Sequence, residues 1–192
     1  IQKCKGSKTM KQILIVYVQD EPGVLNRVSS MIRKRNYNID SLVAGETENA
    51  GITRMTIVLN EPDKTKQSVI VNNLKRLNDV YDVVDTTNIN CHLREYALLK
   101  IAISEVDPEE IKELLNGDHS RILDEDDDVM IVELSEDEST VENTIALLEK
   151  YDIVELMRSG KMAMVSGNDE SHQPKLVKSD PSWTTRRLSE AF

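Results

Sequence analysis

The sequence predicts an α+β protein with two tandem ferredoxin-like βαββαβ units, because one order of elements occurs twice along its 192 residues. Short apolar, β-branched runs alternate with amphipathic stretches whose apolar residues recur every three to four positions. Clusters of Pro, Gly, Asn and Asp separate these runs, as expected of turns and helix starts. Only 4% of the residues are aromatic, so valine, isoleucine and leucine must fill the core, and they pack well on sheets.

The first unit begins with an apolar run at 13–18, which is typical of a strand buried on both faces. The turn after it suits a helix start, with Pro22 at the first helical position and Asp20 or Glu21 in the cap region. From Val24 onward, apolar residues at helical spacing predict an amphipathic helix with one buried stripe. The remaining elements are expected to be a hairpin of two strands, a helix starting at Pro62-Asp63 and a last strand, with the strands at 39–46, 52–59 and 80–89.

The second unit repeats this order. A strand-like run at 95–104 precedes Asp107-Pro108-Glu109-Glu110, which combines a cap, a first-position proline and first-turn acids. Two strands, a helix and a closing strand that bends near Gly160 are expected to follow, at 121–123, 129–134, 139–150 and 153–165. The chain is therefore divided into an N-terminal tail, a first domain, a C-terminal domain and a flexible tail, at 1–10, 11–90, 91–166 and 167–192.

Composition argues against several partners. The formal net charge of −10 and the short basic clusters do not suit nucleic acid or an anionic membrane surface. No apolar run is long enough to span a membrane, and no signal-peptide pattern opens the sequence. Cys4 and Cys91 are far apart and form no C-x-x-C motif, so we expect free thiols and a cytoplasmic protein, or an organellar one in a eukaryotic host.

Residues that could perform catalysis or bind metal are not grouped in the sequence. His92, His119 and His172 fall in or next to expected loops and strand ends, without a nucleophile or base nearby by motif. The acidic run at 124–128 lacks the alternating ligands and central Gly of an EF-hand loop, which favours a solvated hairpin tip. We expect no catalytic residue, no metal site and no cofactor bound by this chain.

The turn from Asp20 to Leu25 has the chemistry of a ligand site. The first N–H groups of the helix after it have no intrahelical partner and favour a carboxylate or phosphate. Gly23 would let a ligand approach the backbone closely, Val24 and Leu25 could wall an apolar pocket, and Asp20 could accept an ammonium group. These residue types suit a small apolar α-amino acid, although a plain strand-to-helix turn would have the same pattern.

Several motifs resemble those of acetolactate synthase small subunits, also called acetohydroxyacid synthase regulatory subunits. Three lie in the first unit and are similar to motifs of the ACT domain of this family, namely PGVLNRV at 22–28, RNYNIDSL at 35–42 and TRMTI at 53–57. Two lie in the second unit, LREYALLKI at 93–101 and VELMRSGKMAM at 154–164. The resemblance covers roughly residues 11–166, and it keeps the family's order of motifs.

The resemblance implies a regulatory subunit without an active site. Members bind the catalytic subunit of acetolactate synthase, which carries thiamine diphosphate, magnesium and FAD. They raise its activity and confer feedback inhibition by a branched-chain amino acid, usually valine. ACT domains of the family pair side by side as homodimers, with effectors at the interface. The implied site combines residues of the turn from one protomer with the start of the second strand of its partner, namely Asp20, Pro22, Gly23, Val24 and Leu25 with Asn38 and Ile39.

One departure and two alternatives remain open. Many bacterial members have Asn where this chain has Asp20, and an ionised carboxylate can only accept hydrogen bonds, so the identity of the amino acid is open. A free-standing ACT-domain sensor that regulates a different enzyme is one alternative. A small enzyme on a ferredoxin-like scaffold is the other, because a fold does not fix a function.

Overall fold

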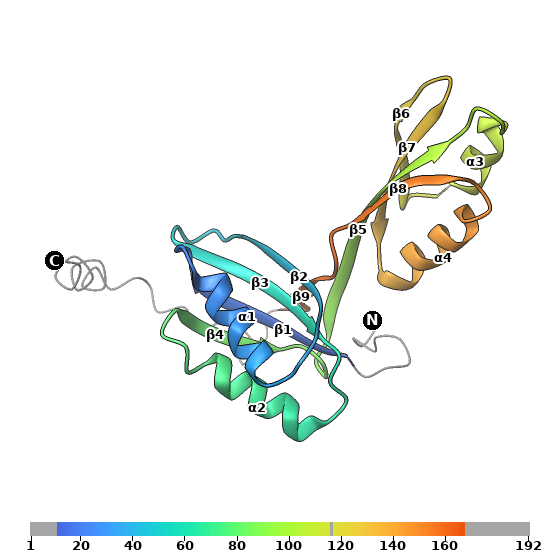
Figure 1. The fold of residues 1–192 in the computed structure, drawn as a ribbon. Helices are drawn as coiled ribbons and strands as arrows, with labels where there is room; N and C mark the ends of the chain where they lie inside the picture. Colours follow the sequence, from blue (N-terminus) through green and yellow to red (C-terminus); the bar gives the residue numbers. More distant parts are fainter. Residues whose placement is uncertain (1–10, 116, 168–192) are drawn as a thin grey trace.

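The computed structural model describes residues 11–115 and 117–167, and it contains two βαββαβ units, the second of which begins with a long strand (Figure 1). The predicted fold class is confirmed. The predicted N-terminal tail, and the C-terminal tail apart from Gly167, lie outside the described residues. In the described part of the chain, no helix is long and apolar enough to cross a membrane.

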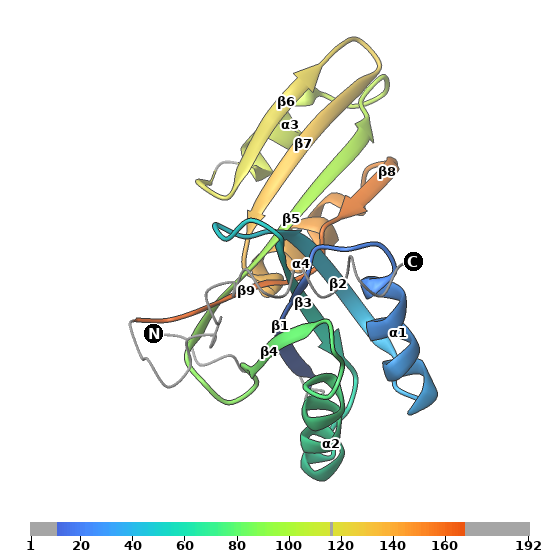
Figure 2. The same cartoon turned by 90° about the vertical axis from the view of Figure 1, so that its left-hand side faces the viewer.

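The first unit is an antiparallel four-stranded sheet in the order β2-β3-β1-β4. Helices α1 and α2 lie on one face of this sheet (Figure 2). Its elements are β1 (Gln12–Gln19), α1 (Val24–Lys34), β2 (Ile39–Glu46), β3 (Ile52–Leu59), α2 (Lys64–Leu74) and β4 (Val80–Asp85). Alternate residues of the central strands meet the buried stripes of the two helices, as the 2.0 and 3.6 periodicities require.

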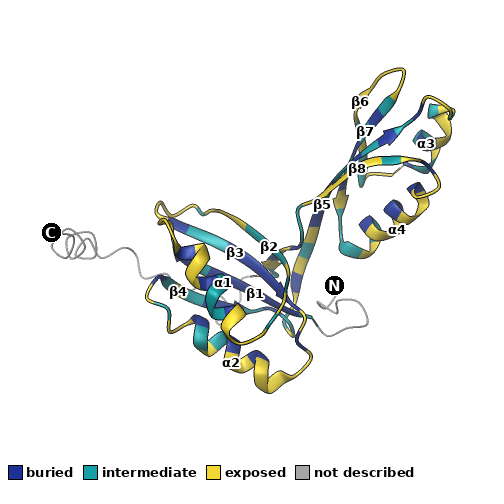
Figure 3. Ribbon diagram, in the orientation of Figure 1, coloured by how far each residue is buried: buried dark blue, intermediate teal, exposed yellow. Residues whose placement is uncertain are grey.

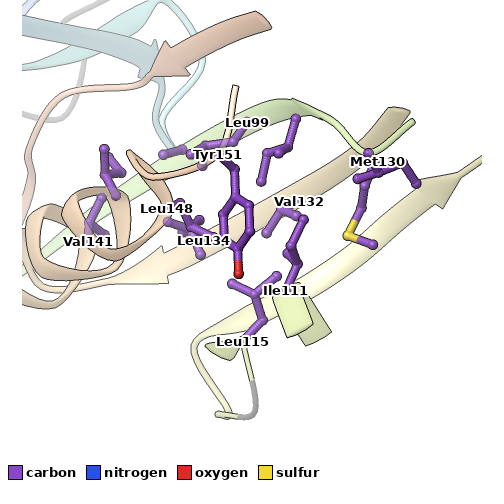
Figure 4. Packing of buried hydrophobic residues seen from close by; sticks show 13 residues of the cluster. Leu99, Ile111, Leu115, Met130, Val132, Leu134, Val141, Leu148 and Tyr151 are labelled. Atoms are coloured by element: carbon purple, nitrogen blue, oxygen red, sulfur yellow. The ribbon is translucent and has the colours of Figure 1, made fainter. Parts of the chain in front are cut away.

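The second unit has the same topology, with the sheet order β6-β7-β5-β8. Its elements are β5 (Cys91–Ala102), α3 (Pro108–Leu114), β6 (Ser120–Glu125), β7 (Val129–Glu136), α4 (Glu138–Leu148) and β8 (Ile153–Arg158). Its core gathers side chains from the sheet and both helices around Tyr151, which follows α4 (Figure 4). Leu99, Ile111 and Leu148 are each fully buried in this cluster.

The closing strand departs from the prediction. We expected one strand over 153–165 with a bend, whereas the structure has two strands, β8 and β9 (Met162–Val165), with a break at Ser159–Lys161. The bend is at Gly160, whose φ of 81° lies in the left-handed region. After this break the chain leaves the second sheet, and β9 pairs with residues 91–94 at the start of β5.

Strand β9 and the start of β5 cover the face of the first sheet that the helices leave open. Apolar side chains of this face form a second core of the first unit together with Ala163 of β9. Leu93 and Val165 pack against this core. Its members from the first sheet are Ile13, Ile15, Val58 and Val84. The central strands of the first sheet are therefore buried on both faces, whereas the outer faces of the helices are exposed (Figure 3).

Cys91, at the start of β5, is buried and disulfide-bonded, so the expectation of a free thiol is wrong there. Cys4 lies outside the described residues.

Three of the four described helices begin with an aspartate cap. Backbone N–H groups of α2, α3 and α4 donate to the carboxylates of Asp63, Asp107 and Asp137 respectively. At α4 the Thr140 N–H donates at 2.9 Å and the Ser139 hydroxyl at 2.6 Å. The Ser139 hydroxyl and then the Thr140 N–H lower the pKa of Asp137 below its ordinary value, because both hydrogen bonds favour the charged carboxylate.

Replacing Asp137 by Ala should lower the free energy of unfolding by about 1 kcal/mol at neutral pH. Because the folded-state pKa of Asp137 is lowered, its contribution is present above the ordinary carboxyl pKa and is lost as pH falls through the folded value. The difference between native protein and variant should therefore shrink in acid. Urea unfolding across a pH series measures this, with the exposed Asp152→Ala as the matched control. A pH-independent difference would contradict the capping role.

Candidate functional site

The turn between β1 and α1 differs from the other helix starts. Gly23 is the N-cap of α1, with φ 85°, and it offers no side-chain hydrogen bond. The expectation that Pro22 occupies the first helical position is wrong, because the helix begins at Val24, and neither Asp20 nor Glu21 is the cap. The first N–H groups of α1 thus have no side-chain acceptor at the cap, which leaves them suited to an anionic ligand group.

The turn is held in place by backbone and side-chain contacts with its neighbours. The Asp20 N–H donates to the Gly51 carbonyl oxygen at 2.9 Å. The Thr53 hydroxyl donates to Asp20 Oδ1 at 3.0 Å, and the carboxylate retains further acceptor capacity. In α1, the Arg27 guanidinium forms an ion pair with the carboxylate of Asp79, whose side chain is nearly buried. These contacts fix the acceptor group of Asp20 beside the start of α1.

The two apolar residues of the turn face different surroundings. Val24 is 2% exposed and belongs to the core between α1 and the first sheet. Leu25 is 48% exposed. In a single chain, therefore, Leu25 rather than Val24 presents apolar surface to a ligand or a second protein chain.

Asn38 and Ile39 lie at the other end of the first sheet. Ile39 pairs with Leu59, whereas Thr53, which contacts Asp20, pairs with Glu46 at the far end of β2. Helix α1 separates the two groups by roughly 16 Å, from its 11 residues at 1.5 Å each. One chain does not bring Asn38 to the Asp20 turn, so the predicted site needs a second copy and stays a prediction.

A polar cleft of about 440 Å³ lies where the two units meet, and the sequence analysis missed it. Residues of β2 form one wall, and the break after β8 and the start of α4 form the other. Its charged side chains are paired: Lys11 with Asp40 at 3.3 Å, Arg158 with Glu95 at 2.6 Å, and Lys161 with Glu138 at 2.6 Å. The signal available in the sequence was Glu95, a charged residue inside an apolar strand.

The histidines and the acidic run do not come together in the described residues. His92 is exposed and His119 half-buried, and His172 lies outside the described residues. The acidic run is a hairpin tip, where the Asp126 carboxylate accepts backbone N–H groups of Val129 and Asp128, which lowers its pKa. Within residues 11–115 and 117–167, no group of three or more His, Cys, Asp or Glu side chains could hold a metal ion.

Both units of the chain match family models of known proteins. Residues 14–82 match the family model of the acetohydroxyacid synthase small subunit-like ACT domain, and residues 94–167 match that of the small subunit of acetolactate synthase. The chain is 39% identical over 161 residues to a probable acetolactate synthase small subunit of Archaeoglobus fulgidus, covering 83% of this chain and 99% of that protein. It is 32% identical to the acetolactate synthase small subunit of Bacillus subtilis, covering 84% of this chain and 94% of that protein.

A solved structure supports the same relationship. The acetolactate synthase small subunit of Thermotoga maritima matches with a TM-score of 0.74 and 30% identity, covering 83% of this chain and 99% of that one. The fold and the turn thus define a protein with an ACT domain and a second unit of like topology. The chain belongs to the acetolactate synthase small-subunit family.

Replacing Gly23 by Ala should destabilise the protein by about 1–2 kcal/mol, because φ of 85° is left-handed. A Cβ there would also lie 3.1 Å from Arg27 Nη1, within the ion pair to Asp79. The control is Gly45→Ala, because a Cβ at Gly45 meets nothing within 4 Å. That variant should stay within about 0.5 kcal/mol of the native protein in urea unfolding. Equal effects of the two substitutions would contradict the strain at Gly23.

Proposed function

We propose that this chain is the regulatory subunit of acetolactate synthase, which activates the catalytic large subunit and confers feedback inhibition by valine or another branched-chain amino acid. Both units match the family, so the proposal covers the whole described chain rather than the ACT domain alone. The observation that carries the effector role is the uncapped start of α1 at Gly23 beside the fixed carboxylate of Asp20.

The turn can recognise the two charged groups of an α-amino acid. The first N–H groups of α1 receive the ligand carboxylate at the positive end of the helix dipole. Asp20, oriented by the Thr53 hydroxyl, receives the ammonium group through a charge-assisted hydrogen bond. Burying the ligand side chain against Leu25 contributes roughly 1.5–3 kcal/mol, which favours an aliphatic amino acid.

The site is completed by a second copy of the chain. Asn38 and Ile39 of that copy approach the Asp20 turn when two ACT domains pair side by side, and the Asn38 amide adds a hydrogen-bonding group. In the single chain Asn38 is exposed, and its amide donates to the Asp40 carboxylate of β2 at a distance of 3.3 Å. This exposed position makes the side chain available to a neighbouring protomer.

The chemical steps belong to the catalytic subunit, which carries thiamine diphosphate, magnesium and FAD. The regulatory chain acts by binding one arrangement of the complex better than another, and an effector inhibits only if it too distinguishes the two arrangements. A coupling free energy of about 1–3 kcal/mol is ordinary for such a system. It corresponds to a change of roughly 5- to 150-fold in the affinity of the effector.

The test is reconstitution of the full chain with its catalytic subunit, followed by valine titration of acetolactate formation. Adding the native chain should raise the rate, and valine should then lower it. Gly23→Asp places a carboxylate where the ligand carboxylate binds, so the valine concentration for half inhibition should rise at least about tenfold, while activation persists. Gly45→Ala is the control. Unchanged inhibition of the Gly23→Asp complex would show that the effector binds elsewhere, and no activation by the native chain would refute the regulatory role.

A further inference from the structure

Within residues 11–115 and 117–167, the chain passes between the two units twice. The first is β5, whose residues 91–94 pair with β9 beneath the first sheet and whose residues 97–101 pair with β8 in the second. The other passage is the return segment, defined as residues 159–163, from the break after β8 to the middle of β9. The orientation of the second unit relative to the first therefore depends on a short stretch of backbone.

The first sheet holds the return segment through β2 and β3. A Cβ at Gly160 would lie 2.8 Å from Ser41 Cβ, so Gly160 packs against the Ser41 side chain with no room for one of its own. Next to it, the Lys161 N–H donates to Ser41 Oγ at 3.4 Å. From β3, the Arg54 guanidinium donates to the Ala163 carbonyl oxygen. Two strands of the ACT domain thus contact consecutive parts of the segment.

The second unit holds the same segment from the opposite side. Lys161 Nζ lies 2.6 Å from Glu138 Oε2 at the start of α4, and both side chains are largely buried. The Ser159 N–H donates to the Tyr96 carbonyl oxygen at 2.9 Å, and the Tyr96 N–H donates to Ser159 Oγ at 3.1 Å. The return segment is therefore packed between a sheet of one unit and a helix start of the other, and it cannot shift without breaking contacts with at least one of them.

Both halves of the proposed effector site lie next to residues that contact the return segment. Thr53, whose hydroxyl donates to Asp20, is followed directly by Arg54. On β2, Ile39 is two residues from Ser41. Adjacent residues of a paired strand move together, because packed interiors deform little and shift between discrete arrangements. A ligand that moves β2 or the start of β3 must then change the contacts at Gly160 or Ala163.

We infer that the return segment transmits effector binding at the ACT domain to the orientation of the second unit. The polar cleft beside it, about 440 Å³ in volume, is bounded by β2 and α4 and gives the two units room to approach or separate. Two ion pairs, Lys161–Glu138 and Lys11–Asp40, line this cleft. This inference rests on the proposed function, because it needs an effector that acts at the first unit.

The test uses Gly160→Ala in the full chain, reconstituted with the catalytic subunit. A methyl group there collides with Ser41 and is strained at φ 81°, so the contact between the segment and β2 is lost while the effector turn is untouched. Valine should bind within about threefold of the native affinity by calorimetry, while the valine concentration for half inhibition rises at least about tenfold, as expected when the coupling between the two units is lost. Ser41→Gly in the Gly160→Ala background should restore inhibition only in part, because it removes the colliding side chain and also the Oγ that accepts from the Lys161 N–H.

The control is Gly167→Ala, which has a similar left-handed φ of 74° and meets nothing within 4 Å; it should behave as the native chain. If Gly160→Ala does not fold, Lys161→Met takes its place in the test, because it removes the ion pair with Glu138. Inhibition at the native valine concentration in both variants would overturn the inference. So would a parallel loss of valine binding, which would make the segment part of the binding site. A native complex that neither binds valine nor responds to it would refute the proposed function, and the inference with it.

Discussion

Strand β1 carries apolar side chains on both of its faces, and each face needs a cover. Leu14, Val16 and Val18 face the helices, whereas Ile13 and Ile15 face the other side of the sheet. Each buried aliphatic side chain contributes roughly 1.5–3 kcal/mol, so neither face can remain in water without a large loss of stability. The helices of the first unit cover only one face. The face with Ile13 and Ile15 is covered by the C-terminal end of the second unit, which returns as β9 and pairs with the start of β5.

This constraint makes the two units dependent on one another. Without β9, the cluster of Ile13, Ile15 and Val58 would lose Ala163 and Val165 as neighbours. The same return places Gly160 against Ser41 and Lys161 against Glu138. The residues that cover the ACT domain thus adjoin those through which we propose that the units communicate. The Asp20 turn lies at the end of β1 and is tied to β3 through Thr53, so it is anchored to a strand that is buried on both faces.

Local periodicity predicted much of this fold, whereas contacts between distant residues could not be predicted. The order of strands and helices in both units followed from their hydrophobic patterns, and the run at 13–18 indicated a strand buried on both faces. The bend at Gly160 was expected from one glycine. What lies beyond that bend was not, because Ala163 and Val165 alternate over too few residues to indicate a separate strand or its partner.

The sequence also predicted part of the candidate site. The turn at 20–25 was identified from residue types alone, but its cap was misplaced, because Asp and Pro are the commoner choices at a helix start and a left-handed Gly23 takes that position here. Its relation to Asn38 depends on a second chain, which no pattern within one sequence can position. The ion pair between Glu95 and Arg158 joins residues 63 positions apart, and such pairs leave no local periodicity.

Isothermal calorimetry of the full chain against valine, leucine and isoleucine tests the central claim most directly, with Asp20→Asn measured alongside. At least one of these amino acids should bind saturably, at one per chain or one per pair of chains. The affinity should also change several-fold on Asp20→Asn, because an amide can donate to the ligand carboxylate whereas an ionised carboxylate cannot. Binding that is indifferent to Asp20→Asn, or no binding by either protein, would contradict an amino-acid site at the β1–α1 turn.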